Sequence, residues 1–198
     1  LTMIPDANFE QELINLGYDT GTPNGSVPTA NINIITTLYV NNQNISDLTG
    51  IEDFTALTDL DCENNQLTSI IISGVTALTN LNCSYNQLTS LDVSGNTILT
   101  DLNCSYNQLT GLDLSNTTTL TYLDCDNNQL TSLDISQNTA LTSLWCHTNQ
   151  LTSLDIRNGN NTNMNISLGV QNNPNLSCIS VDDVSWSTTN WTVANGNI

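Results

Sequence analysis

Apolar residues recur along most of this chain at one fixed interval. From residue 57 to about residue 157, each unit of 21 residues typically follows the pattern Leu-x-x-Leu-x-Cys-x-x-Asn-x-Leu and continues as Leu-x-x-Leu-Asp-aliphatic. A constant period of this length is typical of a solenoid, in which every repeat forms one coil stacked on the previous coil. The cysteines that mark the period are Cys62, Cys83, Cys104, Cys125 and Cys146.

Each coil contains two short stretches in which apolar and polar residues alternate. Leu60 and Cys62 flank Asp61 in one stretch, and Leu112 and Leu114 flank Asp113 in the other. Alternation directs the apolar side chains inward and the intervening side chains outward. We therefore predict a mainly β repeat solenoid, with short parallel strands on two faces and coils about 4.8 Å apart.

The two ends of the chain depart from this pattern. Residues 1–34 predict an N-terminal cap with a helix at about 5–17, where Phe9, Leu13 and Leu16 form one apolar stripe. Residues 35–157 form the solenoid, with five regular coils and one degenerate coil. Residues 158–198 are expected to form a degenerate last coil and a C-terminal cap, because an open end would expose the core.

The repeat resembles the leucine-rich repeat, with cysteine in place of one leucine. Its second half resembles the nested 21-residue variety of bacterial surface proteins, and the chain as a whole resembles exported repeat proteins of marine Bacteroidetes. The likeness covers roughly residues 35–176. It implies an extracellular or cell-surface binding protein without catalytic activity.

Charge narrows the range of partners. The chain contains 19 acidic residues and a single basic residue, Arg157, so its formal net charge is -18. Such a charge repels nucleic acids and anionic membranes, whereas cations, cationic surfaces and neutral polymers remain compatible with it. No run of 18 or more apolar residues is present, so we expect no membrane insertion. The oligomeric state stays open.

Two polar ladders are best explained by structure. The five period-marking cysteines are expected to be buried free thiols, because stacked Cβ atoms about 4.8 Å apart exceed the spacing that a disulfide prefers. The asparagine three residues after each cysteine is expected to satisfy backbone groups at a buried turn.

Ligand-binding residues are expected where the coils differ from one another, around each cysteine on the outward face of the first sheet. Carboxylates, amides and aromatic rings on such a face suit stacking on sugars with hydrogen bonds to hydroxyls, and they suit protein partners equally well. A solvated face without a ligand is the alternative. The candidates are Tyr39, Asp61, Asn82, Tyr85, Asn103, Tyr106, Tyr122, Asp124, Trp145 and His147.

Aspartates also stack on the second face, at Asp92, Asp113, Asp134 and Asp155. Like charges about 5 Å apart repel, so a compensating interaction is expected. Hydrogen bonds from nearby Ser and Thr residues are one explanation, and bound calcium is the other. Calcium is the only cofactor that the sequence suggests.

Catalysis is not expected. The single histidine, His147, has no evident nucleophile beside it, and an open sheet face offers no apolar pocket to raise a carboxylate pKa. We therefore predict a non-enzymatic module that recognises a polysaccharide or protein. A calcium-stabilised adhesin spacer is one alternative, and an ice-binding protein that uses the regular threonine rows is another.

Overall fold

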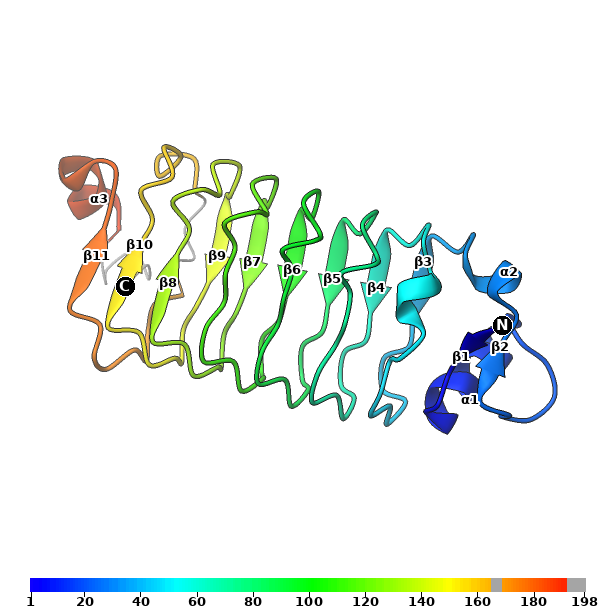
Figure 1. The fold of residues 1–198 in the computed structure, drawn as a ribbon. Helices are drawn as coiled ribbons and strands as arrows, with labels where there is room; N and C mark the ends of the chain where they lie inside the picture. Colours follow the sequence, from blue (N-terminus) through cyan, green and yellow to red (C-terminus); the bar gives the residue numbers. More distant parts are fainter. Residues whose placement is uncertain (165–168, 192–198) are drawn as a thin grey trace.

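The computed structural model describes residues 1–164 and 169–191. The coils of the solenoid stack one after another in a single row (Figure 1). The N-terminal elements lie at one end of the stack and the last strand and helix at the other. The parts of the predicted C-terminal cap at 165–168 and 192–198 lie outside the described residues. Among the described residues, none of the helices has the length and apolar content needed to cross a membrane.

One parallel sheet runs along the solenoid, with one strand from each coil. Its strand order is β3-β4-β5-β6-β7-β9, and equivalent residues pair in register. The central leucine of every strand is at most 2% exposed, and its neighbours face outward. The predicted alternation on this face is confirmed. The strands are β3 (Thr37–Tyr39), β4 (Asp59–Asp61), β5 (Asn80–Asn82), β6 (Asp101–Asn103), β7 (Tyr122–Asp124) and β9 (Ser143–Trp145).

The second parallel sheet is shorter than predicted. It contains β8 (Ser132–Asp134), β10 (Ser153–Asp155) and β11 (Cys178–Ser180), in the order β11-β10-β8. The equivalent segments of the first regular coils form no strand. There the coils are joined by a side chain instead: the buried amide of Asn96 donates to the carbonyls of Ile72 and Val75.

The N-terminal cap contains a short antiparallel pair, β1 (Thr2–Met3) with β2 (Ser26–Val27), and the helices α1 (Ala7–Asn15) and α2 (Thr29–Ile32). Helix η1 (Ile51–Asp53), a 3-10 helix, belongs to the first coil. The predicted capping helix is present but shorter than expected. Its Phe9 and Leu13 are buried, whereas Leu16 is exposed because the chain leaves the helix at Asn15.

Asp6 fastens this cap to the solenoid. Its Oδ1 atom accepts the N–H groups of Asn8 and Phe9 at the start of α1, and its Oδ2 atom accepts the N–H and hydroxyl of Ser46 in the first coil. Partial burial alone would raise the pKa of Asp6, but the hydrogen bonds from Ser46 and α1 outweigh it and lower the pKa. One carboxylate thus caps a helix and joins two parts of the fold.

At the opposite end, β11 extends the second sheet beyond β10, and α3 (Val184–Asn190) follows it. Trp186 and Trp191 meet edge to face, with ring centroids 5.6 Å apart, and Trp191 is buried. Cys178, which the sequence placed in the cap, is an exposed residue of β11.

Candidate functional site

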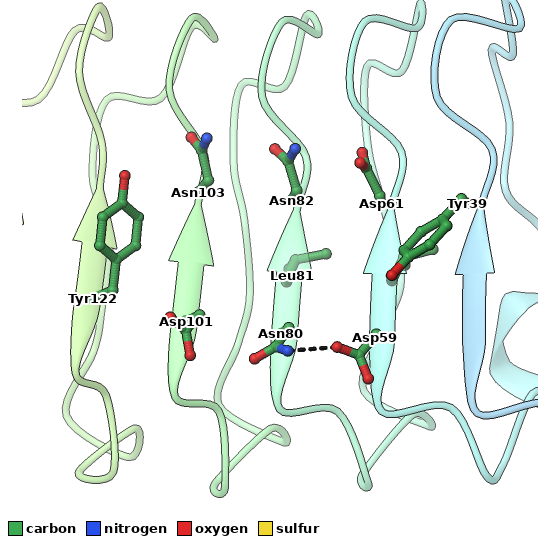
Figure 2. Close-up of a pocket in the computed structure, with 10 residues that line it drawn as sticks. Tyr39, Asp59, Asp61, Asn80, Leu81, Asn82, Asp101, Asn103 and Tyr122 are labelled. Carbon is green, nitrogen blue, oxygen red and sulfur yellow. Dashed lines mark hydrogen bonds between the residues drawn. The ribbon is translucent and has the colours of Figure 1, made fainter.

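The outward face of the six-stranded sheet carries an open groove of about 390 Å³. Tyr39 and Tyr122 stand on its two flanking strands, and carboxylates and amides lie between them (Figure 2). Four strand spacings separate the two tyrosines along the sheet, which is about 19 Å. The groove is lined by Tyr39, Asp59, Leu60, Asp61, Asn80, Leu81, Asn82, Asp101, Asn103 and Tyr122.

Neutral donors hold the carboxylates of this groove. Asp59 accepts the Thr58 hydroxyl at 2.6 Å and the side-chain amide of Asn80, and Asp101 accepts the Thr100 hydroxyl at 2.7 Å. These hydrogen bonds orient the carboxylates without neutralising them. The groove therefore presents oriented negative charge to solvent.

Tyr85 and Tyr106 form an aromatic pair beside the groove, on the turns that follow β5 and β6. Their rings stack with centroids 4.1 Å apart and an interplanar angle of 9°, and each side chain is about half exposed, at 46% and 45%. Both residues have left-handed backbone, with φ of 53° and 52°. Asparagine tolerates this conformation better than tyrosine, and Asn64 and Asn127 occupy the same position in the flanking coils. A hydrogen bond with Tyr106 raises the pKa of Tyr85.

A third group lies at the C-terminal end of the sheet, around Asp126 and His147. The Asp126 Oδ1 atom accepts the backbone N–H of His147 at 2.7 Å, and its Oδ2 atom contacts the Nε2 atom of the imidazole. The imidazole also meets the Trp145 ring edge to face. A Cβ atom on Gly169 would lie 3.0 Å from the His147 ring and 3.1 Å from the Trp145 ring, so glycine leaves room for both.

Burial sets the proton affinity of this group. Burial, followed by the negative charge of Asp124, raises the pKa of Asp126 to about 7. Burial also raises the pKa of Asp124, against the opposing effects of His147 and the Tyr122 hydroxyl.

Replacing Asp126 by asparagine is expected to make the protein more stable above pH 7, by about 2–4 °C in melting temperature. Because the folded-state pKa of about 7 exceeds that of the unfolded chain, folded Asp126 retains a proton that the unfolded chain releases. The stabilisation that comes from protonated Asp126 is therefore lost as the pH rises from about 4 to about 7. Asparagine keeps an acceptor for the His147 N–H and removes this loss.

Melting curves of wild type and Asp126→Asn between pH 4 and pH 8 measure the effect. Asp113→Asn is the matched control, because it removes the same charge where hydrogen bonds from Ser115 lower the carboxyl pKa. Its melting temperature should not rise relative to wild type with increasing pH. Parallel profiles for Asp126→Asn and wild type would contradict the assignment.

The structure divides the ten predicted binding residues into three groups. The groove contains Tyr39, Asp61, Asn82, Asn103 and Tyr122. Tyr85 and Tyr106 form the stacked pair, and Asp124, Trp145 and His147 belong to the C-terminal group.

The ten predicted binding residues do not include Asp59, Asn80 and Asp101, which line the groove, or Asp126. Alternation places the first three on the outward face, two residues before predicted positions, but it does not tell which outward residues line the groove. Asp126 precedes His147 by one period and pairs with it across adjacent coils. Their separation of one repeat places them side by side in adjacent coils, and this spacing was the signal in the sequence for the pair.

The position directly after each cysteine does not face solvent in the middle coils. Ser84, Ser105 and Asp126 are 1%, 4% and 6% exposed. The two serines donate their hydroxyls to Asn82 and Asn103 at 2.7 Å. The chain turns at the next residue, so the alternation of inward and outward side chains ends at the cysteine. Alternation therefore wrongly places the residue after the cysteine on the exposed face in these coils.

The aspartate stack on the second face has a structural role at each turn. Every carboxylate accepts the backbone N–H group two residues later, at 2.8–3.1 Å, and Asp155 also pairs with Arg157. Hydrogen bonds from Ser94 and Ser115 lower the pKa values of Asp92 and Asp113. Within residues 1–164 and 169–191, no three His, Cys, Asp or Glu side chains are grouped to hold a metal ion. Calcium at Asp92, Asp113, Asp134 and Asp155 stays a prediction.

The threonine row beside the first sheet also has a structural role. Thr79, Thr121 and Thr142 each donate their hydroxyl to the carbonyl of the threonine one coil earlier, at 3.1–3.2 Å. The Thr100 hydroxyl donates to Asp101 instead. These hydroxyls are engaged by the solenoid itself.

Comparison with solved structures identifies the architecture. The functional domain of InlJ from Listeria monocytogenes, described as including a cysteine ladder, matches 77% of this chain at 41% identity with a TM-score of 0.68. Internalin C2 from the same organism matches 93% of the chain at 22% identity with a TM-score of 0.56, and a Leptospira interrogans LRR protein matches 77% at 21% identity and 0.56. This chain has the leucine-rich-repeat fold.

The leucine-rich-repeat chain corresponds to 36% of the InlJ domain, 89% of internalin C2 and 44% of the Leptospira protein. No family model and no curated protein matches the sequence. These structures confirm the predicted leucine-rich-repeat solenoid, and the InlJ domain shares the cysteine ladder as well as the fold. The resemblance to exported proteins of marine Bacteroidetes stays a prediction.

Proposed function

We propose that this chain is a non-enzymatic binding module of an extracellular or cell-surface protein, and that it recognises a protein or polysaccharide through the groove between Tyr39 and Tyr122. One observation carries the proposal. The buried leucines, cysteines and asparagines repeat from coil to coil, whereas the outward residues of this open groove vary among Asp, Asn and Tyr. Likeness to internalins supports an adhesin-like role in binding proteins.

Catalysis by Asp126 and His147 is disfavoured by their surroundings. The Asp126 side chain is 8% exposed, and both of its oxygens are engaged by His147. A general acid or base must reach the reacting group of a substrate. Asp126 has little surface left with which to do so.

Alanine at both Tyr39 and Tyr122 is expected to weaken ligand binding at least tenfold without unfolding the protein. Tyr39 is 58% exposed, so its removal costs the fold little, whereas aromatic side chains dominate binding energy at interfaces. Glycan arrays and surface-protein arrays probed with wild type would supply ligands of either class. Titration of each ligand into wild type and the double variant then measures the loss.

The matched control replaces Ile71 and Ile98, exposed apolar residues away from the groove, by alanine. Its affinity should stay within about twofold of wild type. Full affinity in the tyrosine variant, or no ligand on any array, would count against the groove as the binding site. The second outcome is the one that a structural spacer predicts.

A further inference from the structure

We infer that the groove between Tyr39 and Tyr122 binds an extended protein segment that carries Lys or Arg side chains. The inference rests on the proposed function, because it names the chemistry of the partner for the same surface. Three observations support it: the charge of the groove, the absence of a cation to match that charge, and the aromatic residues at its ends.

Carboxylates occupy both rows of the groove. Asp59 and Asp101 lie on one side of the central leucines, and Asp61 lies on the other, as Figure 2 shows. The neighbouring Glu63 accepts the side-chain amide of Asn82 at 3.1 Å and adds a fourth negative group. The hydrogen bonds that position these carboxylates come from neutral groups.

The chain contains no basic side chain that could neutralise this charge. Its one Arg or Lys residue is Arg157, which pairs with Asp155 in β10, a strand of the second sheet. His147 contacts Asp126 at the C-terminal end of the sheet. Neither residue lines the groove, so its negative charge is left for a partner to match.

The tyrosines suit the same partner. Tyr39 and Tyr122 present aromatic rings at the two ends of the groove, and the faces of such rings attract ammonium and guanidinium groups. A span of about 19 Å holds about six residues of extended chain at roughly 3.3 Å per residue. A neutral polymer would have to desolvate the carboxylates without returning a charge to them.

The test compares two triple variants with the same change in charge. The groove variant carries Asp59→Asn, Asp61→Asn and Asp101→Asn. The control carries Asp92→Asn, Asp113→Asn and Asp134→Asn on the second face, where asparagine keeps the acceptor for each turn N–H. Each triple changes the net charge from -18 by the same amount.

Binding of a fluorescent hexalysine peptide is measured by anisotropy at low and high salt. Hexaglutamate, a peptide of the opposite charge, is the control. We expect the groove variant to bind hexalysine at least tenfold more weakly than wild type, and the control variant to stay within about twofold. Added salt should weaken wild-type binding more than binding by the groove variant. Equal losses in both variants would show attraction to net charge alone and would overturn the inference, as would the absence of hexalysine binding.

Failure of this inference is distinguishable from failure of the proposed function. Suppose that a neutral glycan or peptide binds wild type, binds the Tyr39→Ala/Tyr122→Ala variant more weakly, and binds the groove triple variant as well as wild type. This result would support the groove as the binding site and would overturn the inference that its partner is cationic. Ligands insensitive to both sets of changes would place binding elsewhere and overturn both.

Discussion

Asn107→Ala is expected to destabilise the protein by about 3–5 kcal/mol. The Asn107 amide donates to the carbonyls of Cys83, Cys104 and Ser105 at 3.0–3.2 Å, and its Oδ1 atom accepts the N–H of Leu88 at 2.9 Å. Alanine would leave these backbone groups without this partner in a buried turn, and each unsatisfied buried group costs about 1–3 kcal/mol. Urea denaturation of the purified protein measures the loss.

Gln108→Ala is the control for this experiment, because Gln108 is the exposed neighbour of Asn107 in the same coil. Its effect should lie within about 0.5 kcal/mol. Asn107→Leu supplies buried apolar volume without hydrogen bonds and should destabilise as alanine does. A loss below about 1 kcal/mol in either Asn107 variant would show that the ladder is not needed to satisfy the turn.

The asparagine ladder also explains why the fold was predictable from the sequence. Five asparagines, each at most 9% exposed, make equivalent bonds: each donates to the cysteine carbonyl three residues earlier and to a carbonyl of the preceding coil, and each Oδ1 accepts a backbone N–H of that coil. They are Asn65, Asn86, Asn107, Asn128 and Asn149. Positions that make the same contacts in every coil carry the same residue in every coil. The repeated positions in the sequence are therefore those that stabilise the fold. The cysteines follow the same rule.

The second sheet shows the limit of this reasoning. Alternation identifies extended segments in every coil, but a ladder forms only where neighbouring backbones approach each other. Ser153 pairs with Ser132 and Cys178, whereas the coils around Ile72 are bridged by the side chain of Asn96. The period carries no information on this choice, because both arrangements bury the same aliphatic residues.

The candidate site was predictable in part for a different reason. Alternation placed Asp61 and Tyr122 on the outward face, and the groove contains both. It could not place Ser84 or Asp126, because the left-handed residue that follows each of them turns the chain. Nor does it tell which outward residues line a hollow, since that depends on the sizes of side chains in adjacent coils.

Two tyrosines at left-handed positions set the middle coils apart. Tyrosine at φ of about 50° is less favourable than the asparagine found in flanking coils, yet Tyr85 and Tyr106 adopt it side by side. Stacking at 4.1 Å offsets part of this cost. The result is a stacked aromatic pair next to the groove.

A thiol reagent is expected to modify one of the six cysteines rapidly in the native protein and all six after unfolding. Cys62, Cys83, Cys104, Cys125 and Cys146 are 0% exposed, and the thiols of Cys62 and Cys125 donate to backbone carbonyls of the next coil at 3.4 Å. Cys178 is exposed on β11, and all six cysteines are free thiols. Mass spectrometry after timed labelling gives the count.

Burial protects the ladder through both access and ionisation. It raises the pKa values of Cys83 and Cys146 to about 12, so at pH 8 about one thiol in 10⁴ would be the reactive thiolate. Labelling of the ladder should therefore wait for opening of the solenoid and slow as stability rises. Cys178→Ser is the control and should leave no rapidly reacting thiol. Rapid modification of a second cysteine in the native protein would mean that the coils open locally, and the cysteines would then report on motion as well as on the packed core.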